Sequence, residues 1–170
     1  MKEIWKDIPN YEGLYQASNL GRVKSLPRKI KQKNNSFKIT KERIIKQGIG
    51  SSKYLYVVLC NGFNNKSFTV HSLIAMAFLN HKPNGHKLVV DHINNIKTDN
   101  RLENLQIITH RKNSSKDKKG TSKYTGVSYN KINKKWNSFI YNGNNNINLG
   151  SYNTEEEAHE AYEINLKNYE

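Results

Sequence analysis

The stretch LVVDHINNIKTDNRLENLQIITHRKN, residues 88–113, contains two short apolar runs that are separated by a polar segment. The runs KLVVD and LQIIT have the length and the β-branched composition of strands, and HINNIKTDNRLEN between them indicates a polar loop. The basic residues that follow, HRKNSSKDK, are compatible with a helix whose N-cap would be Thr109. The stretch therefore predicts a strand, a loop, a second strand and a helix.

Four polar residues of this stretch are candidates for a catalytic centre. Asp91 would end the first strand and Asn113 would lie on the helix, and their oxygens are hard ligands for a divalent cation. His92 would supply a general base, because neutral imidazole takes a proton from water near pH 7. We expect Asn104 to hold the loop that aims His92. The set suits metal-assisted phosphodiester hydrolysis, although an Asp-His pair taken alone also fits a surface pair without function.

The composition favours a nucleic-acid partner. The chain has 170 residues, a net charge of +14, 35% hydrophobic residues and a mean hydropathy of −0.85. These values indicate small modules with much surface, and the basic excess points to a polyanion. Of the charged residues, 27 of the 28 bases but only 8 of the 14 acids precede residue 154. We therefore expect the surface that faces the polyanion to lie before the last helix, although AT-rich codon usage would also raise the lysine count.

Cys60 is the only cysteine, which excludes a disulfide within the chain and a cysteine-based zinc site. The N-terminal residues MKEIWKDIPN contain no apolar segment of the signal-peptide type, and no apolar run approaches the length of a transmembrane helix. A membrane-surface role lacks a strongly basic amphipathic helix. We therefore expect a cytoplasmic protein.

The segments before residue 88 read mainly as short strands. Aromatic and apolar residues flank a turn at residues 19–21, and KYLYVVLCNGFNNKSFTV predicts a hairpin with its turn at residues 61–62. VHSLIAMAFL has helical apolar spacing, and we expect its His71 to serve packing or capping rather than ligation. Residues 22–46 hold ten bases and one acid. This basic stretch either tracks a phosphate backbone or is a solvated loop.

The last part of the chain reads as a separate unit. YTGVSYN, WNSFIYN and INLGSY predict three antiparallel strands, with a turn at residues 143–146 between the last two. Thr154 and Glu157 have the spacing of a capping box for a helix that turns Ala158, Ala161 and Tyr162 inward. We therefore expect a small sheet packed on one helix.

Three segments resemble known families. VVDHINNIKTDNRLENLQIITHRKN resembles the motif of HNH nucleases, in the subgroup of phage and intron-encoded homing endonucleases. EIWKDIPNYEGLYQASNLGRVKSL resembles the nuclease-associated module that often precedes such domains, and residues 124–163 resemble the plant apetala (ethylene-response-factor) DNA-binding domain.

The resemblance implies an α+β protein made of several modules. They are an N-terminal β-rich DNA-binding module over residues 1–60, a ββα-metal HNH nuclease domain over 61–117, a linker over 118–123 and an apetala-like DNA-binding domain over 124–170, whose three-stranded antiparallel sheet packs on one helix.

By position in the HNH motif, the resemblance implies that Asp91 and Asn113 bind the metal, that His92 is the general base and that Asn104 orders the loop. Many HNH enzymes have histidine where this chain has Asn113, which disfavours a tight zinc site and favours Mg²⁺ or Mn²⁺. His110 is a possible substitute ligand, ranked below Asn113 because it lies about one helical turn away.

The implied partner is double-stranded DNA. The candidate contacts lie in the basic stretch, on the helix after the nuclease strands and on the first two strands of the C-terminal sheet: Arg22, Lys24, Arg111, Lys112, Ser128, Asn130, Lys135, Trp136, Ser138 and Ile140. Trp136 is also compatible with a core position. No arginine lies between residues 124 and 153, so lysine and asparagine must read the bases. We therefore expect modest specificity, or a preference for adenine.

The sequence thus predicts a metal-dependent homing-type DNA endonuclease acting in the bacterial host of a phage. We expect a monomer that nicks one strand, with a dimer that cuts both strands as the alternative. A DNA-binding transcriptional regulator with an inactive nuclease centre is the first rival, and an RNA-directed or structural basic protein is the second.

Overall fold

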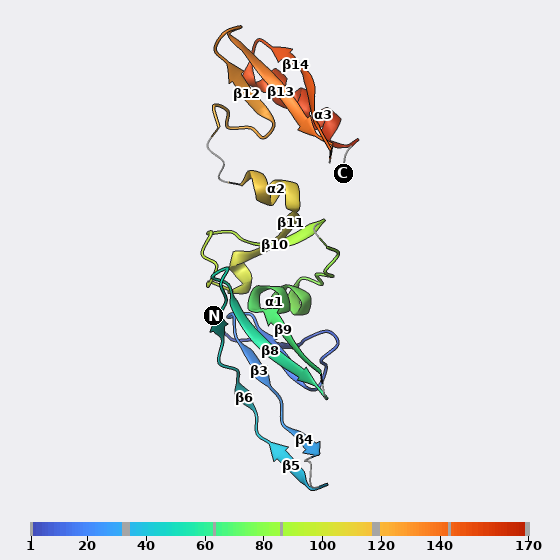
Figure 1. Cartoon of the computed structure of the whole chain (residues 1–170). Helices are drawn as coiled ribbons and strands as arrows, with labels where there is room; N and C mark the ends of the chain where they lie inside the picture. The colour runs from blue at the N-terminus through green and yellow to red at the C-terminus, as the bar shows by residue number, and fades with distance from the viewer. Residues whose placement is uncertain are drawn as a thin grey trace. The chain divides into compact units, whose positions relative to one another are not determined.

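The computed structural model describes residues 2–31, 35–62, 64–85, 87–116, 120–142 and 144–168. It divides into two compact units, residues 1–114 and 115–170 (Figure 1). Several small antiparallel sheets and a few helices make up the described residues, which confirms the predicted α+β class. No helix among these residues is long and apolar enough to cross a membrane.

The described strands of the first unit form four antiparallel sheets. The first sheet has the order β1 (Trp5–Asp7), β2 (Tyr15–Ser18), β3 (Val23–Ser25) and β6 (Arg43–Ile44). A hairpin pairs β4 (Arg28–Lys31) with β5 (Phe37–Thr40), and a third sheet has the order β7 (Gly48–Ile49), β8 (Leu55–Asn61) and β9 (Asn64–Thr69). The fourth pairs β10 (Leu88–His92) with β11 (Leu105–Thr109). Its helices are α1 (Val70–Phe78), the 3₁₀ helix η1 (Leu102–Asn104) and α2 (His110–Ser115).

One hydrophobic core runs through the first unit. Val70, Leu73 and Ile74 of α1 are fully buried, as the helical spacing predicts. They belong to one cluster with residues of β2, β3, β8 and β11: Tyr15, Ala17, Val23, Val57, Leu59 and Leu105, together with Ile8. Residues 1–60 and 61–117, expected as two modules, therefore share a core, and the expected boundary between them falls within β8.

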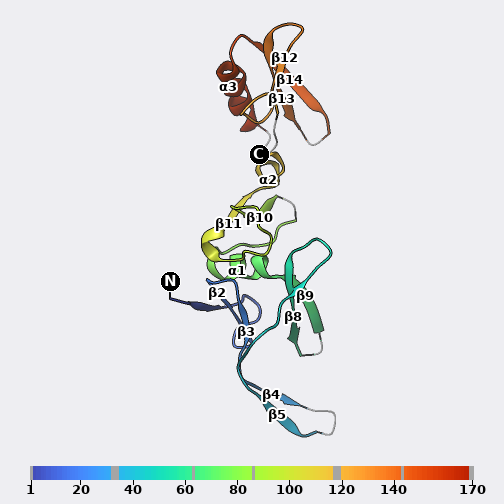
Figure 2. The same ribbon diagram turned by 90° about the vertical axis from the view of Figure 1, so that its left-hand side faces the viewer.

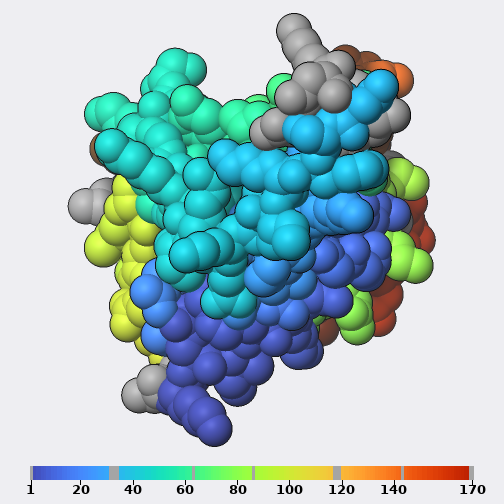
Figure 3. Space-filling model, turned by 90° about the horizontal axis from the view of Figure 1, so that it is seen from below, coloured from blue at the N-terminus to red at the C-terminus, as the bar shows by residue number. Residues whose placement is uncertain are grey.

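The basic stretch at residues 22–46 contains the β4–β5 hairpin. The alternative prediction of an unstructured, solvated loop is therefore not what its described residues form. Figures 1 and 2 show the hairpin reaching away from α1. Arg28 ties its base to the core, because its Nη2 donates to the Tyr15 hydroxyl at 2.7 Å. Phe37 and Ile39 are exposed. In Figure 3 the blue and cyan segments, which include this stretch, make up most of the face in view.

The second unit is a three-stranded antiparallel sheet with a helix, as predicted. It has the order β12 (Val127–Asn130), β13 (Lys135–Tyr141) and β14 (Asn146–Tyr152), and α3 (Glu155–Leu166) packs on it. Thr154 and Glu157 form the predicted capping box at the start of α3. Gly143, in the predicted turn, and residues 117–119, at the end of the nuclease domain and in the linker, lie outside the described residues.

Candidate active site

The antiparallel pair of β10 and β11 positions the Asp-His dipeptide. Asp91 lies opposite Gln106, and His92 lies opposite Leu105. The Asp91 Oδ2 accepts a hydrogen bond from the Gln106 Nε2 at 2.8 Å. Asp91 is 7% exposed and His92 is 4% exposed. The strand therefore delivers both side chains at its carboxyl end, one residue further than the sequence predicted.

The imidazole of His92 is held by side chains from three other segments. Its Nε2 lies 2.9 Å from the Oδ1 of Asn100. The ring of Tyr54 stacks on it at a centroid distance of 5.8 Å and an interplanar angle of 25°. The ring of His71 meets it edge-on at 5.1 Å and 81°. Sequence reasoning missed Asn100 and Tyr54, because no spacing rule links a loop amide or a preceding aromatic residue to this histidine.

His71 occupies a buried packing position on α1, as expected for it. Its Nε2 lies 3.2 Å from the Thr69 hydroxyl, and its Nδ1 has no hydrogen-bond partner among the described residues. Burial, with smaller contributions from the nearby charges of His92 and His81, lowers the pKa of His71 to about 4. His71 is therefore neutral near pH 7 and adds no positive charge beside His92.

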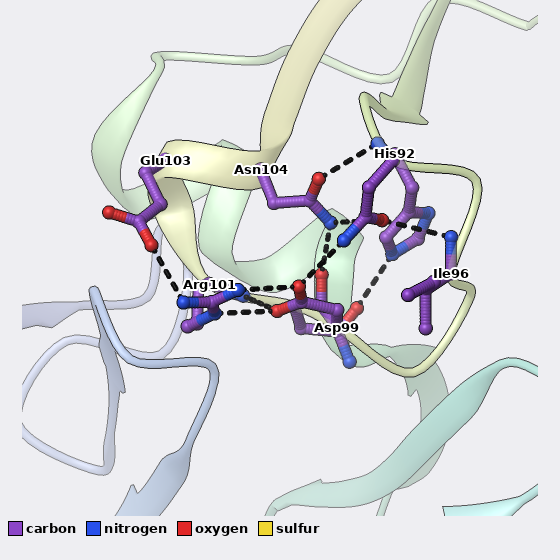
Figure 4. Close-up of polar contacts among 8 residues, drawn as sticks. His92, Ile96, Asp99, Arg101, Glu103 and Asn104 are labelled. Carbon is purple, nitrogen blue, oxygen red and sulfur yellow. Dashed lines mark hydrogen bonds and ion pairs between the residues drawn. The ribbon is translucent and has the colours of Figure 1, made fainter.

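Asn104 anchors the loop between β10 and β11. Its Oδ1 accepts from the backbone N–H of Asn94 at 3.0 Å. Its Nδ2 donates to the Asn94 Oδ1 at 2.9 Å and to the Asp99 carbonyl at 2.8 Å. Figure 4 shows these contacts at the start of β11. The side chain thus closes the loop onto itself, which is the contact pattern expected for a loop-ordering residue.

An ion-pair cluster stiffens the same loop and was not foreseen. Arg101 donates from Nη2 to the Asp99 Oδ2 and from Nη1 to the Glu103 Oε1, both at 2.8 Å (Figure 4). The guanidinium of Arg101 holds the pKa of the Asp99 carboxyl well below its usual range. The Asp99 carboxyl is therefore ionised near neutral pH.

Asn113 lies half-buried on α2, which follows β11 without a break. The Thr109 hydroxyl accepts from the backbone N–H of Lys112 at 3.2 Å, a capping contact at the start of that helix. His110 is exposed, and its Nδ1 lies 3.3 Å from the Ser114 hydroxyl.

The Asp91 carboxylate and the Asn113 amide offer oxygen donors, which are hard ligands for a divalent cation. In the part of the chain that the structure describes, no three His, Cys, Asp or Glu side chains are grouped to hold a metal ion. A cation at Asp91 would need amide oxygen, water or phosphate to complete its shell. That is the kind of shell Mg²⁺ adopts in phosphate-handling sites.

The predicted DNA contacts of the first unit differ in their surroundings. Arg22 is exposed and forms a bidentate pair with Glu3, with the Nε 2.9 Å from the Oε1. Lys24 is largely covered, because its Nζ lies 3.2 Å from the Glu42 Oε2 and 4.6 Å from the centre of the Trp5 ring. On α2, Lys112 is exposed and Arg111 is half-buried.

The register of the second sheet separates the remaining candidates into two faces. Ser128 pairs with Asn137, and Asn130 pairs with Lys135. Because directly paired residues share a face, these four side chains lie on the face opposite α3. Asn137 was not predicted; its Oδ1 accepts from the Ser151 hydroxyl at 2.7 Å.

The prediction that Ser138 contacts DNA is wrong. Ser138 has no exposed surface and Ile140 is 1% exposed, because alternation along β13 turns both toward α3. Trp136 shares their face, is half-buried and packs against Tyr129 at a centroid distance of 5.0 Å. Trp136 therefore lies on the face that packs on α3, which agrees with the core position that the sequence also allowed for it.

Comparison with known families identifies two segments. Residues 3–60 match the family model of the NUMOD4 motif, and residues 69–115 match that of the HNH endonuclease. The chain thus contains a segment that matches the NUMOD4 motif, followed by a segment that matches the HNH endonuclease family. These matches support the predicted nuclease. Neither of the two matched segments reaches the sheet of the second unit, so they do not test its predicted apetala-like identity.

Two curated relatives are similar to about two thirds of this chain. DNA endonuclease I-HmuI of Bacillus phage SP01 is 38% identical over 109 residues, which are 64% of this chain and 54% of that protein. An uncharacterized HNH endonuclease of Acanthamoeba polyphaga mimivirus is 33% identical over 113 residues, 65% of this chain and 25% of that protein. The chain therefore spans about half the length of the first relative and about a quarter of the length of the second.

A solved structure agrees with this homology. The structure titled "DNA binding and cleavage by the HNH homing endonuclease I-HmuI" superposes with a TM-score of 0.51 at 34% sequence identity, covering 66% of this chain and 56% of that chain. About two thirds of the chain thus share their architecture with the HNH homing endonuclease I-HmuI.

Proposed function

We propose that the protein is a metal-dependent DNA endonuclease of the homing type. The observation that carries the proposal is the Asp91-His92 pair at the end of β10, followed through β11 by Asn113 on α2, within the segment that matches HNH endonucleases. The similarity to I-HmuI, a DNA endonuclease that binds and cleaves DNA, supports DNA as the substrate.

In the proposed reaction the side chains divide the work. His92 takes a proton from the water that attacks the phosphodiester, so it needs a fixed ring, which the contacts of Asn100, Tyr54 and His71 supply. Asn104 keeps the loop closed beside that ring. Gln106 holds the Asp91 carboxylate through its Oδ2.

Asp91 and Asn113 are the residues that would hold the cofactor, because HNH endonucleases generally use a divalent metal and both side chains offer hard oxygens. A bound Mg²⁺ or Mn²⁺ would supply Lewis-acid stabilisation of the charge that develops on the phosphate. Competition between Mg²⁺, Mn²⁺ and Zn²⁺ in a cleavage assay would rank the ions.

The DNA contacts of the first unit are proposed on exposed basic groups. Arg22, Lys112 and the partly covered Lys24 and Arg111 would bind phosphates, which position the duplex without reading its sequence. The exposed basic side chains of the β4–β5 hairpin, such as Lys29 and Lys38, would extend this contact. Replacing one phosphate-binding lysine with a neutral residue should reduce the slope of the logarithm of the binding constant against the logarithm of the salt concentration by about one.

The second unit is proposed as an apetala-like DNA reader. Its open face presents Ser128, Asn130, Lys135 and the newly placed Asn137, and asparagine is the side chain that pairs with adenine in the major groove. The predicted modest or adenine-directed specificity is thus a proposal about this face, and it leaves out Ser138.

The mode of cleavage is proposed to be a nick. One HNH segment, residues 69–115, provides one centre, and one centre hydrolyses one strand at a time. The protein would act as a monomer in the cytoplasm of the bacterial host, in keeping with its phage homologue.

A supercoiled-plasmid assay tests the function. The plasmid carries DNA from the protein's own genome and is incubated with Mg²⁺, Mn²⁺ or a chelator, using the wild type and His92→Ala. We expect metal-dependent open circles that the variant does not produce, while linear product would indicate a dimer. Salt-sensitive binding without cleavage in any metal would instead establish the DNA-binding regulator.

A further inference from the structure

We propose that Asn100 is a positioning residue for His92, and that the Asn19–Gly21 turn between β2 and β3 holds Asn100 in place. The NUMOD4 motif would thereby belong to the catalytic scaffold as well as to the DNA-binding surface. The inference rests on the proposed function, in which His92 is the general base, and deepens it.

The first observation is the hydrogen bond between the two side chains. The Asn100 Oδ1 lies 2.9 Å from the His92 Nε2, and Asn100 is only 3% exposed. An amide oxygen at Nε2 accepts the ring N–H, which leaves the lone pair of the neutral imidazole on Nδ1. Asn100 would thus fix both the orientation of the ring and the nitrogen that acts as base.

The second observation is an unpaired donor on the same amide. The Asn100 Nδ2 is buried and has no hydrogen-bond partner among the described residues. Leaving a buried donor unpaired is unfavourable, because the group has lost its hydrogen bonds to water and gained none in the protein. The hydrogen bond of the Oδ1 alone therefore does not explain why this amide is buried, and contacts of the surrounding backbone must also fix its position. Buried polar groups that lack a partner are often found at functional sites.

The third observation identifies what sets that position. Gly21 has a φ of +85°, and a Cβ on it would lie 3.1 Å from the carbonyl carbon and 3.3 Å from the Cβ of Asn100. Only glycine combines this backbone conformation with so close an approach. Two residues away along each segment, the backbone N–H of Leu102 donates to the Asn19 carbonyl at 2.9 Å. The turn therefore packs directly against the backbone that carries Asn100.

The N-terminal segment also supports the other side of the ring. Tyr54, which stacks on His92, has the Lys97 Nζ 4.8 Å from its ring centre. That Nζ also donates to the Ser52 carbonyl at 3.2 Å. All the N-terminal residues in these contacts fall within residues 3–60, the segment that matches the NUMOD4 motif. The motif and the catalytic loop are thus joined at several points around one imidazole.

Substitutions at Asn100 test the hydrogen bond. Asn100→Ala should lower the single-turnover cleavage rate at saturating protein by about 10- to 100-fold, with the DNA dissociation constant unchanged. Asn100→Asp keeps an acceptor oxygen and should recover most of the rate. Thr98→Ala, an exposed position in the same loop, should match the wild type. If Asp were as slow as Ala, the acceptor role would be overturned.

A matched pair of glycine variants tests the support. Gly21→Ala and Gly13→Ala both force alanine into a positive φ, +85° and +70°, but a Cβ at residue 13 would meet nothing within 4 Å. Both should lose stability, and only Gly21→Ala should lower the cleavage rate of the folded protein. Equal rates for the two variants would remove the turn from the scaffold, and this holds even if Asn100→Ala does not fold.

The ¹⁵N spectrum of the His92 ring separates this inference from the function itself. It is recorded on the full chain without DNA or metal, above the ordinary imidazole pKa. The wild type should show a single tautomer with the proton on Nε2, and Asn100→Ala should show a mixture. Those spectra in a protein that never cleaves DNA would uphold the positioning and reject the nuclease. Identical spectra in both proteins would reject the positioning whatever the cleavage.

Discussion

His71 couples protonation to stability, because its pKa is lowered to about 4 by burial, with His92 and His81 contributing. An unfolded histidine has a pKa near 6.5. Between these values the unfolded chain binds more protons than the folded one, so acid favours unfolding. The unfolding free energy should be unaffected by His71 above about pH 6.5 and should fall by roughly 3 kcal/mol as the pH drops to 4.

Denaturant titrations over this pH range measure the effect. In His71→Gln the slope between pH 6.5 and 4 should be shallower than in the wild type, whereas His110→Gln, at an exposed position, should keep the wild-type slope. Parallel curves for the wild type and His71→Gln would show that His71 is not buried as a neutral ring.

Asn104 offers a second residue-level prediction. It makes three side-chain hydrogen bonds within the loop, so Asn104→Ala should lower the unfolding free energy by about 1–3 kcal/mol. The amide of Asn94, which loses its acceptor, should exchange with deuterium faster than in the wild type. Protection of Asn94 that is unchanged in the variant would mean that the loop is ordered by other contacts.

The sequence could reveal residues whose role depends on near neighbours. Asp91 and His92 were found because adjacent residues at a strand end need no further information to be placed together. Asn100 was missed, because its partner is chosen by the path of the loop. Ser138 was misplaced, because strand alternation assigns residues to two faces without saying which face packs on α3.

At the level of elements, α3 depends on its capping box. The Thr154 hydroxyl accepts from the backbone N–H of Glu157 at 3.2 Å, and the Glu157 carboxylate accepts from the backbone N–H of Thr154 at the same distance. Thr154→Ala should therefore lower the unfolding free energy of the second unit by about 1 kcal/mol. Thr154→Ser keeps the hydroxyl and should stay near the wild type.

Thermal unfolding followed by helix ellipticity gives the readout for the Thr154 pair. A loss of the same size in the alanine and serine variants would assign the effect to the methyl group rather than to the cap.

Elements with a strong local pattern were predictable. The apolar spacing of α1 and the β8–β9 hairpin needed only local rules, although β8 includes Asn61, which pairs with Asn64, so the predicted turn at residues 61–62 begins one residue too early. The β4–β5 hairpin was not resolved from the alternative of a loop, because its sequence is dominated by lysine and its apolar residues remain exposed. Such a ribbon has no buried face to leave a periodic signal.

At the scale of the whole molecule, the shared core makes the HNH segment dependent on the residues before it. Leu73 and Ile74 of α1 pack with Val57 and Leu59 of β8 and with Tyr15 and Val23 of the first sheet. A fragment of residues 61–116 loses these partners and should not unfold cooperatively. A fragment of residues 2–116 retains them and should.

Denaturant unfolding of both fragments checks this expectation. It is followed by far-UV ellipticity, because residues 61–116 contain no tryptophan whose fluorescence could be used. Cooperative unfolding of the 61–116 fragment would show that the HNH segment carries a sufficient core by itself. The α+β class and the strand–loop–strand–helix order from β10 to α2 followed from the sequence, but the joining of two recognisable segments into one core did not, because long-range packing leaves no mark in either segment alone.

The most direct test of the central claim is the single-turnover cleavage rate of one duplex by the wild type and by His92→Gln, with the dissociation constant measured on the same duplex. If His92 is the general base, the rate should fall by about 10²-fold or more while the dissociation constant stays within about twofold. An unchanged rate in His92→Gln would contradict the account.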